Sequence, residues 1–349
     1  MDTCKKFNFD GLIVFEMSKN HGGDVQHGLR IVREFSAITR ETRVKGAVKL
    51  QFRNLKSYIH PQHRKDGDER MRRYFTSHLS EKAFGKIVNE IKKQGLLSMA
   101  TPFDEESVDT IDRLEVDLIK VASSSAKDWP LLCRLVKSKK PVICSTGGLM
   151  IKDIDALVDF FKNSRTEFAL MHCVSIYPTP REESQLNRIG IMKERYKNIP
   201  IGFSTHENPE DYDIVKMAYA KGARLFEKHV TSLNKSFSED PSFKKVLSYT
   251  ATPNQMKKWI ASYRDAITLC GVEHYEAYNQ NEREIKSIQS MVRGMYFKHP
   301  VKKGGIIKKS GVYFAIPLED GQLHSGQWKN DLRADKDYEI DQAVPKTLL

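Results

Sequence analysis

The segment Pro200-Ile-Gly-Phe203, followed by Tyr212–Ala220 and then by Ala223-Arg-Leu-Phe-Glu227, decides the fold of this chain. Its two apolar runs are short and do not alternate with polar residues, which is typical of parallel strands buried on both faces. The stretch between them carries apolar residues at helical spacing. The segment therefore predicts one strand–helix–strand unit.

The same unit recurs toward the N-terminus. Six further apolar runs have the same character: Leu12–Glu16, Ala47–Gln51, Leu96–Ala100, Asp117–Val121, Pro141–Cys144 and Phe168–His172. Segments with helical period lie between them, namely Val25–Phe35, Glu81–Lys92, Trp129–Lys137 and Ile154–Phe161. Eight strands alternating with helices predict an α/β protein built as a (β/α)₈ TIM barrel. A doubly wound sheet is the competing architecture, and the count of eight favours the barrel.

The pattern changes after the eighth predicted strand. Thr252-Pro-Asn-Gln has good N-cap chemistry and predicts a helix that ends near Leu269. We therefore predict a barrel domain over residues 1–272 and a polar linker over 273–287. Residues 288–349, with short β-like pieces and Gly and Pro between them, predict a small β-rich domain.

Composition leaves the function open but bounds the class of protein. The 57 Lys and Arg exceed the 45 Asp and Glu, giving a formal net charge of +12. This charge is compatible with a nucleic-acid partner, with a small anionic substrate, or with a solvated basic surface. No apolar run reaches the roughly 18–20 residues of a membrane helix, and no signal peptide is evident. The five scattered cysteines form no CxxC pair, so we expect reduced thiols and a cytoplasmic protein.

Polar side chains lie at the end of every predicted strand. In a TIM barrel these ends converge on one mouth, where the chemistry takes place. Lysine and histidine within apolar strands are unusual, because charged groups are rarely buried unless they are paired or functional. The residues concerned are Glu16, Lys49, Gln51, Thr101, Lys120, Ser123, Ser145, His172, Ser175, Tyr177, Ser204, His206, Glu227 and His229.

These residue types are suited to binding an anion and a metal, but structural roles are also open to them. Lysines and hydroxyls can hold a phosphate and a carboxylate, and the Gly147-Gly148 turn can offer backbone N–H groups to an anion. His206 and His229 could share a divalent metal, or could be hydrogen-bonded structural histidines. The two lysines could instead form ion pairs with Glu16 and Glu227 as part of the scaffold. The basic stretch His63–Arg73 has the composition of a solvated loop or lid.

The ordered motifs match a known family. They are Glu16-Met-Ser-Lys-Asn-His-Gly-Gly, Val48-Lys-Leu-Gln51, Thr101-Pro-Phe-Asp104, Ile119-Lys-Val-Ala-Ser123, Ser145-Thr-Gly147, His172-Cys-Val-Ser-Ile-Tyr-Pro-Thr-Pro180, Gly202-Phe-Ser-Thr-His206 and Phe226-Glu-Lys-His-Val-Thr231. In this order the chain resembles the sialic acid (N-acetylneuraminate) synthase family. The piece from about Ile288 resembles, more loosely, that family's antifreeze-like (SAF) domain.

The resemblance implies a condensation of phosphoenolpyruvate with the aldehyde of an N-acylated hexosamine such as N-acetylmannosamine, giving a nine-carbon ulosonic acid and phosphate. It implies that His206 and His229 bind a divalent metal, Mn²⁺ with Mg²⁺ or Co²⁺ as alternatives, which would polarise the aldehyde and position a water. Glu16 would handle protons there. Phosphoenolpyruvate would be surrounded by Lys49, Thr101, Lys120, Ser123, Ser145 and Ser204.

The resemblance also implies an acceptor side and a partner subunit. Gln51, Tyr177 and Glu227 would line the acceptor side, with Ser175 where the family usually has Asn. In the family, the small domain closes the barrel of the other subunit in a domain-swapped homodimer, and Arg293 is the best match for its arginine that contacts the acyl group. Other departures are Thr205 in place of Asp, the segment Ser57–Leu79, and Ser238-Glu-Asp-Pro241 after strand eight. They face the acceptor in the family, so the identity of the sugar stays open.

Two alternatives to this function follow from the sequence. The first is another phosphoenolpyruvate-dependent ulosonate synthase with a phosphorylated sugar, for which Arg72 and Arg73 are the local candidates to bind the second phosphate. The second is a basic barrel that binds nucleic acid, which predicts aromatics interleaved with Lys and Arg on one face. No such pattern is evident, so we expect neither a nucleic-acid nor a membrane partner.

Overall fold

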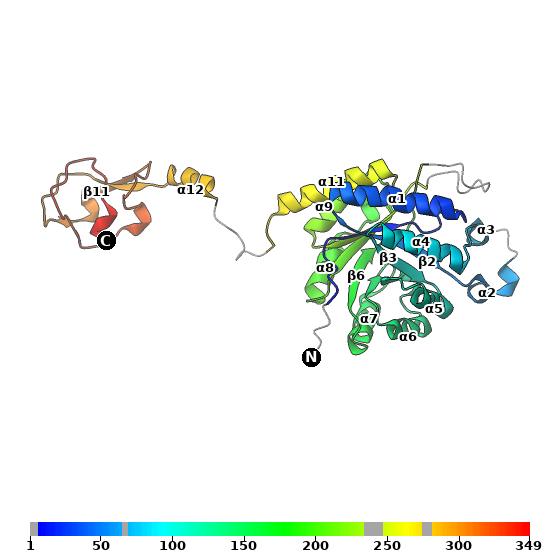
Figure 1. Ribbon diagram of the computed structural model, residues 1–349. Coiled ribbons are helices and arrows are strands. Elements are labelled where there is room, and N and C mark those ends of the chain that lie inside the picture. The colour runs from blue at the N-terminus through cyan, green and yellow to red at the C-terminus, as the bar shows by residue number, and fades with distance from the viewer. Residues whose placement is uncertain (1–5, 65–68, 234–246, 274–280) are drawn as a thin grey trace. The chain divides into compact units, whose positions relative to one another are not determined.

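The computed structural model describes residues 6–64, 69–233, 247–273 and 281–349 (Figure 1). The chain divides into two compact units, Met1–Gly271 and Val272–Leu349. The first unit contains all eight predicted parallel strands, and the second contains short antiparallel pieces. The departure Ser238-Glu-Asp-Pro241 lies outside the described residues.

The first unit is a closed barrel of eight parallel strands in sequential order, so the predicted TIM-barrel fold is confirmed. The strands are β1 (Leu12–Glu16), β2 (Lys45–Phe52), β3 (Leu97–Pro102), β4 (Leu118–Val121), β5 (Val142–Ser145), β6 (Phe168–Cys173), β7 (Ile201–Thr205) and β8 (Leu225–His229). Pairing of β1 with β8 closes the ring, and in its register Glu16 lies opposite both Lys49 and His229.

Several strands extend further than predicted. The sequence places the ends of the last four strands at Cys144, His172, Phe203 and Glu227, whereas β5 to β8 end one or two residues later. Polar side chains suggested that each strand had stopped, but the backbone ladder continues because these side chains face the interior of the barrel. Ser145, Ser204 and His229 are therefore held on strands and not on loops.

The barrel interior has an apolar layer below a polar one. Strand residues alternate between the interior and the helices, and the interior apolar cluster includes Leu12, Val14, Ala47, Met99, Leu118, Ile143, Met171 and Leu225. The next inward positions on several of these strands are polar, such as Glu16, Lys49, Lys120 and Glu227. The apolar layer closes the base, and the polar layer forms the floor of the mouth.

Helices cover the outside of the barrel (Figure 1). They are α1 (Val25–Thr42), α2 (Leu55–Tyr58), α3 (Glu69–Thr76), α4 (Glu81–Lys93), α5 (Glu105–Arg113), α6 (Trp129–Leu135), α7 (Ile151–Asn163), α8 (Asn187–Arg195), α9 (Asp213–Ala220) and α11 (Pro253–Cys270). A large apolar core lies between these helices and the outer strand faces. The predicted cap of α11 is confirmed, since the Thr252 hydroxyl accepts from Gln255 N and the Gln255 side chain accepts from Thr252 N.

The second unit is small and β-rich. It contains α12 (Glu282–Gln289), β9 (Gly294–Phe297), β10 (Ile306–Ile307), β11 (Val312–Ala315) and β12 (Leu332–Arg333). β9 pairs with β11 and β10 with β12, both antiparallel, around an apolar core that includes Phe297 and Leu323. Helix α12 occupies the later part of the segment predicted as a linker, and residues 274–280 lie outside the described residues.

Two further observations bear on the composition. None of the described helices is long and apolar enough to cross a membrane. The four described cysteines, Cys133, Cys144, Cys173 and Cys270, are free thiols, and Cys4 lies outside the described residues.

Candidate active site

A cavity of about 570 Å³ opens at the carboxyl ends of the barrel strands. Every barrel residue that the resemblance proposes for phosphoenolpyruvate, acceptor or metal lines it. These are Glu16, Lys49, Gln51, Thr101, Lys120, Ser123, Ser145, Ser175, Tyr177, Ser204, His206, Glu227 and His229. Seven strands or the loops that follow them supply these side chains, and the first strand supplies Glu16, so the whole barrel builds the site.

Four buried charges form a network on the floor of the cavity. Lys49 Nζ lies 2.6 Å from Glu16 Oε2 and 2.8 Å from Glu227 Oε1. Lys120 Nζ lies 3.5 Å from Glu227 Oε2. The ion pairs that the sequence left as an alternative therefore exist, and they line the cavity. Glu227, which the resemblance places on the acceptor side, lies between the two lysines assigned to phosphoenolpyruvate.

Burial and pairing set the protonation of this network. Burial alone would raise the pKa of Glu227, but the ammonium groups of Lys120 and Lys49 outweigh it and hold that pKa below its usual range. Burial lowers the pKa of Lys49 to about 7, although the Glu227 carboxylate opposes the shift. Lys49 is thus a cation that can lose its proton near neutral pH.

Hydroxyl and backbone donors surround Lys120. Its Nζ donates to Ser145 Oγ at 2.6 Å, and Gly147 N donates to Ser123 Oγ at 3.0 Å. The buried Thr101 Oγ1 has no hydrogen-bond partner among the described residues. A buried hydroxyl without a partner is costly, so a ligand in the cavity would stabilise it. Donors of this kind around two lysines suit a phosphate and a carboxylate.

His206 and His229 lie side by side, with ring centroids 5.4 Å apart. His206 Nδ1 lies 2.9 Å from the carbonyl of Val174, which leaves Nε2 as the acceptor of a neutral ring. Burial lowers the pKa of His206 to about 4, and burial together with His206 and Lys49 lowers that of His229. Neutral imidazoles are metal ligands. Among the described residues, no group of three or more His, Cys, Asp and Glu could hold an ion alone, so the chain fits a metal as a two-histidine site completed by substrate or water.

The outer side of the cavity is amide and aromatic. Gln51 Nε2 donates to Glu16 Oε1 at 2.9 Å, which fixes the amide above the charged floor. The ring centroids of Tyr177 and His206 lie 4.1 Å apart, and those of Tyr249 and His229 lie 5.1 Å apart. Burial raises the pKa of Tyr177 and of Tyr249, so both present neutral hydroxyls. Polar groups beside aromatic faces are suited to a sugar.

Some candidates lie elsewhere. Arg293 belongs to the second unit, where it is exposed and its carbonyl accepts from Ser325 N; its role in contacting an acceptor stays a prediction. His172 does not line the cavity: its ring stacks on Phe203 and its Nε2 lies 2.8 Å from the carbonyl of Ser184. It packs behind the site.

Arg53 and Tyr249 are among the lining residues that the sequence missed. Arg53 could have been predicted, because it lies two residues beyond Gln51 of β2 and so faces the same side of the strand as Lys49 and Gln51. Tyr249 follows the long connection after β8, where no periodicity relates it to a strand. Arg72 and Arg73, the proposed binders of a second phosphate, lie on α3 and are absent from the residues that line the cavity.

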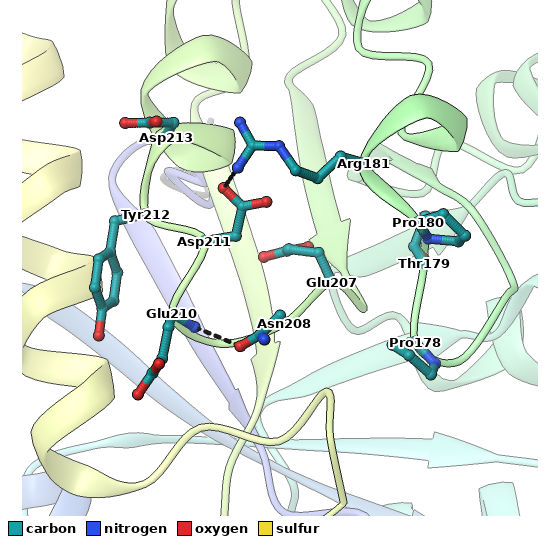
Figure 2. Close-up of a pocket in the computed structure, with 10 residues that line it drawn as sticks. All are labelled: Pro178, Thr179, Pro180, Arg181, Glu207, Asn208, Glu210, Asp211, Tyr212 and Asp213. Carbon is teal, nitrogen blue, oxygen red and sulfur yellow. Dashed lines mark hydrogen bonds and ion pairs between the residues drawn. The ribbon is translucent and has the colours of Figure 1, made fainter.

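A second cavity, of about 560 Å³, lies beside the loops that follow β6 and β7 (Figure 2). It is lined by Pro178–Arg181 and by residues from Glu207 to Asp213. Arg181 forms an ion pair with Asp211, and Glu210 N donates to Asn208 Oδ1. None of the residues proposed from the sequence lines this cavity, so the candidate chemistry stays in the barrel mouth.

Comparison with known proteins identifies the family of this chain. The model of the NeuB family matches residues 41–275. A pseudaminic acid synthase from Campylobacter jejuni is 26% identical over 98% of each chain, and an N,N'-diacetyllegionaminic acid synthase from the same species is 28% identical over 86% of this chain and 89% of that protein. A crystal structure of a spore coat polysaccharide biosynthesis protein E from Chromobacterium violaceum is 34% identical, with a TM-score of 0.90 over 97% of this chain and 98% of that one. The match covers most of the barrel and confirms the family that the motifs indicated: the chain belongs to the NeuB family.

Proposed function

We propose that this protein condenses phosphoenolpyruvate with the open-chain aldehyde of an N-acyl hexosamine to form a nine-carbon ulosonic acid. C3 of phosphoenolpyruvate bonds to the aldehyde carbon, and the aldehyde oxygen takes a proton. Water adds its oxygen at C2, and phosphate leaves as its bond to C2 breaks. The observation that carries the proposal is the convergence of Lys49, Lys120 and the histidine pair in one cavity. The printed names of the Campylobacter relatives, which are synthases of such acids, support it.

Different residues of the cavity bind phosphoenolpyruvate, transfer a proton and orient the acceptor. Lys120, with Ser145 beside it at 2.6 Å, and Lys49 bind the phosphate and carboxylate of phosphoenolpyruvate. Glu16 lies 2.6 Å from Lys49 and accepts from Gln51, so it can take a proton at the boundary between the two substrates. Gln51 and Tyr177 orient the acceptor from the outer side.

A divalent metal, Mn²⁺ or alternatively Mg²⁺ or Co²⁺, would be held by His206 and His229 and would act as a Lewis acid on the aldehyde. We extend the proposal to a homodimer in which Arg293 of one subunit contacts the acyl group in the barrel of the other. The alternative, a synthase of a shorter ulosonate, would bind phosphoenolpyruvate with the same residues. It would differ from the proposed enzyme only in its acceptor sugar.

The test is turnover. The protein is incubated with phosphoenolpyruvate, Mn²⁺ and a panel of N-acyl hexosamines, and phosphate release and the ulosonic acid are measured. We expect both in equal amounts with at least one acceptor, and none from His206→Ala or His229→Ala. Calorimetry measures the loss of Mn²⁺ binding, and circular dichroism shows separately that each variant keeps its fold. Absence of turnover with every acceptor would remove the proposed function.

A further inference from the structure

Arg53 extends a row of functional side chains along β2. Residues two apart on a strand face the same side, about 6.6 Å apart. Lys49, Gln51 and Arg53 all line the cavity in this order, from its floor toward its rim. Lys49 is assigned to phosphoenolpyruvate and Gln51 to the acceptor, so Arg53 lies where the far end of the acceptor would be.

The guanidinium of Arg53 is held in place by aromatic rings. Its carbon lies 3.6 Å from the centroid of the Phe103 ring, 4.7 Å from that of Tyr74 and 5.8 Å from that of Tyr58. Its Nη2 donates to Gln51 Oε1 at 2.9 Å, whereas its buried Nε has no hydrogen-bond partner among the described residues. Stacking of this kind orients the planar fork and leaves donors for a ligand.

Among the residues that the structure describes, Arg53 also has no counter-ion in contact. No carboxylate within the described part of the chain forms an ion pair with it. The Asp104 carboxylate instead accepts from Asn54 N and from Ser107 N, both at 2.8 Å. Burial lowers the pKa of Arg53, and Tyr74, Tyr58 and, last, Asp104 oppose the shift. A half-buried cation without an anion in contact is costly, which is what a site awaiting an anionic group would show.

A second cation meets the same ring. Lys19 also lines the cavity, and its Nζ lies 4.3 Å from the centroid of Tyr74. On the floor, by contrast, Lys49 and Lys120 share two carboxylates, Glu16 and Glu227. The two lysines of the floor are therefore paired with described carboxylates, whereas Arg53 forms no ion pair with one.

Building on the proposed function, we propose that the acceptor sugar carries an anionic substituent, a phosphate or a carboxylate, at the end away from its aldehyde, and that Arg53 binds it. The span from Lys49 to Arg53, about 13 Å along the strand, accommodates phosphoenolpyruvate and an open-chain hexose placed end to end. Arg53 is thus a residue that determines specificity, whereas the alternative with a phosphorylated sugar names Arg72 and Arg73 as candidates.

The experiment measures kcat/KM for acceptors that differ only at C6. N-acetylmannosamine, its 6-phosphate and its 6-carboxylate are compared at saturating phosphoenolpyruvate and Mn²⁺, and the N-acetylglucosamine series is run in parallel. We expect one charged acceptor to be preferred over the neutral sugar, and Arg53→Gln to reduce that preference by about 10- to 100-fold. Arg53→Lys should keep part of it, because the charge remains but the fork is lost. Whether phosphate or carboxylate shows the preference identifies the substituent.

Arg33→Gln is the matched control, since this exposed arginine on α1 pairs with Glu90 away from the cavity; it should leave the preference unchanged. A wild-type preference for the neutral sugar, or an equal preference in wild type and Arg53→Gln, would overturn the assignment. If no acceptor is turned over, the proposed function fails, and calorimetry then tests Arg53 alone. Equal Kd values of wild type and Arg53→Gln for both charged sugars would overturn it.

Discussion

Lys228 donates two hydrogen bonds to Glu207, at 2.8 Å to Oε1 and at 2.9 Å to the backbone carbonyl. Both side chains are almost fully buried, and each is next in sequence to one of the paired histidines. Thr205, which stands where the family usually has Asp, lies opposite Lys228 in the strand register, and its buried hydroxyl has no partner among the described residues. The carboxylate that pairs with Lys228 comes from Glu207, two residues after Thr205.

Removing the ammonium from this pair should destabilise the barrel. Lys228→Met leaves the Glu207 carboxylate buried without a cation, so the free energy of unfolding should fall by about 3–5 kcal/mol. The double variant Lys228→Met/Glu207→Met should recover most of this loss, because neither charge remains. Urea denaturation followed by circular dichroism measures both. A single variant as stable as wild type would show that water reaches the carboxylate.

Gly147 and Gly148 should respond differently to the same substitution. A Cβ at Gly147 would lie 2.5 Å from Ser175 Oγ and 2.7 Å from Ser123 Oγ, so Gly147→Ala displaces the Ser123 hydroxyl and should weaken phosphoenolpyruvate binding about tenfold or more. A Cβ at Gly148 meets open space, but its φ is +72°, so Gly148→Ala should instead cost about 1–2 kcal/mol of stability. Calorimetric Kd values and thermal melts separate the two. The reverse pattern would contradict the placement of the anion at this turn.

Phosphoenolpyruvate binding should weaken as pH rises through about 7. The pKa of Lys49, lowered by burial to about 7, means that the lysine is protonated below this pH and neutral above it. Binding an anion requires the charged form, so Kd should rise by up to about tenfold per pH unit above neutrality. Lys49→Met removes this dependence, and comparison with it cancels the titration of the ligand's own phosphate. Identical pH profiles in the two proteins would show that Lys49 keeps its proton.

Removing the Glu227 carboxylate tests the cause of that pKa. The carboxylate favours the ammonium form of Lys49, so Glu227→Gln should lower the pKa of Lys49 and move the fall in affinity to lower pH. A shift to higher pH would contradict the sign of this interaction.

Arg293→Ala should raise KM for the acceptor more than KM for phosphoenolpyruvate, because the proposed contact is with the acyl group. The change concerns an exposed side chain, so little loss of stability is expected, and thermal melting checks this. An unchanged acceptor KM would show that the second unit does not contribute to the site.

The barrel could be predicted because its strands are apolar runs with one polar end. The runs at Leu12–Glu16 and Phe168–His172, for example, fall within one residue of the observed strands. The ends of β7 and β8 could not be placed. Ser204 and His229 are polar because they line the cavity, although both lie within their strands.

The site could be predicted because its side chains lie at the polar ends of these strands. The prediction reaches only the residues that strand alternation or a motif identifies. Glu227 shows the limit: its partners Lys49 and Lys120 come from β2 and β4, far away in sequence. The sequence left these ion pairs as one alternative, and only the closure of the barrel decides that Glu227 pairs with the lysines. Helix α12 was missed because its segment is polar and none of its residues is buried, so it has no apolar stripe facing a core.

The ion pairs on the cavity floor have a consequence for the catalytic cycle. In the proposed function, phosphoenolpyruvate competes with Glu16 and Glu227 for the N–H donors of Lys49 and Lys120. This competition lowers affinity for the substrate and, equally, for the departing phosphate, since the carboxylates can reclaim the lysines as it leaves. The arrangement therefore favours rapid product release over tight binding.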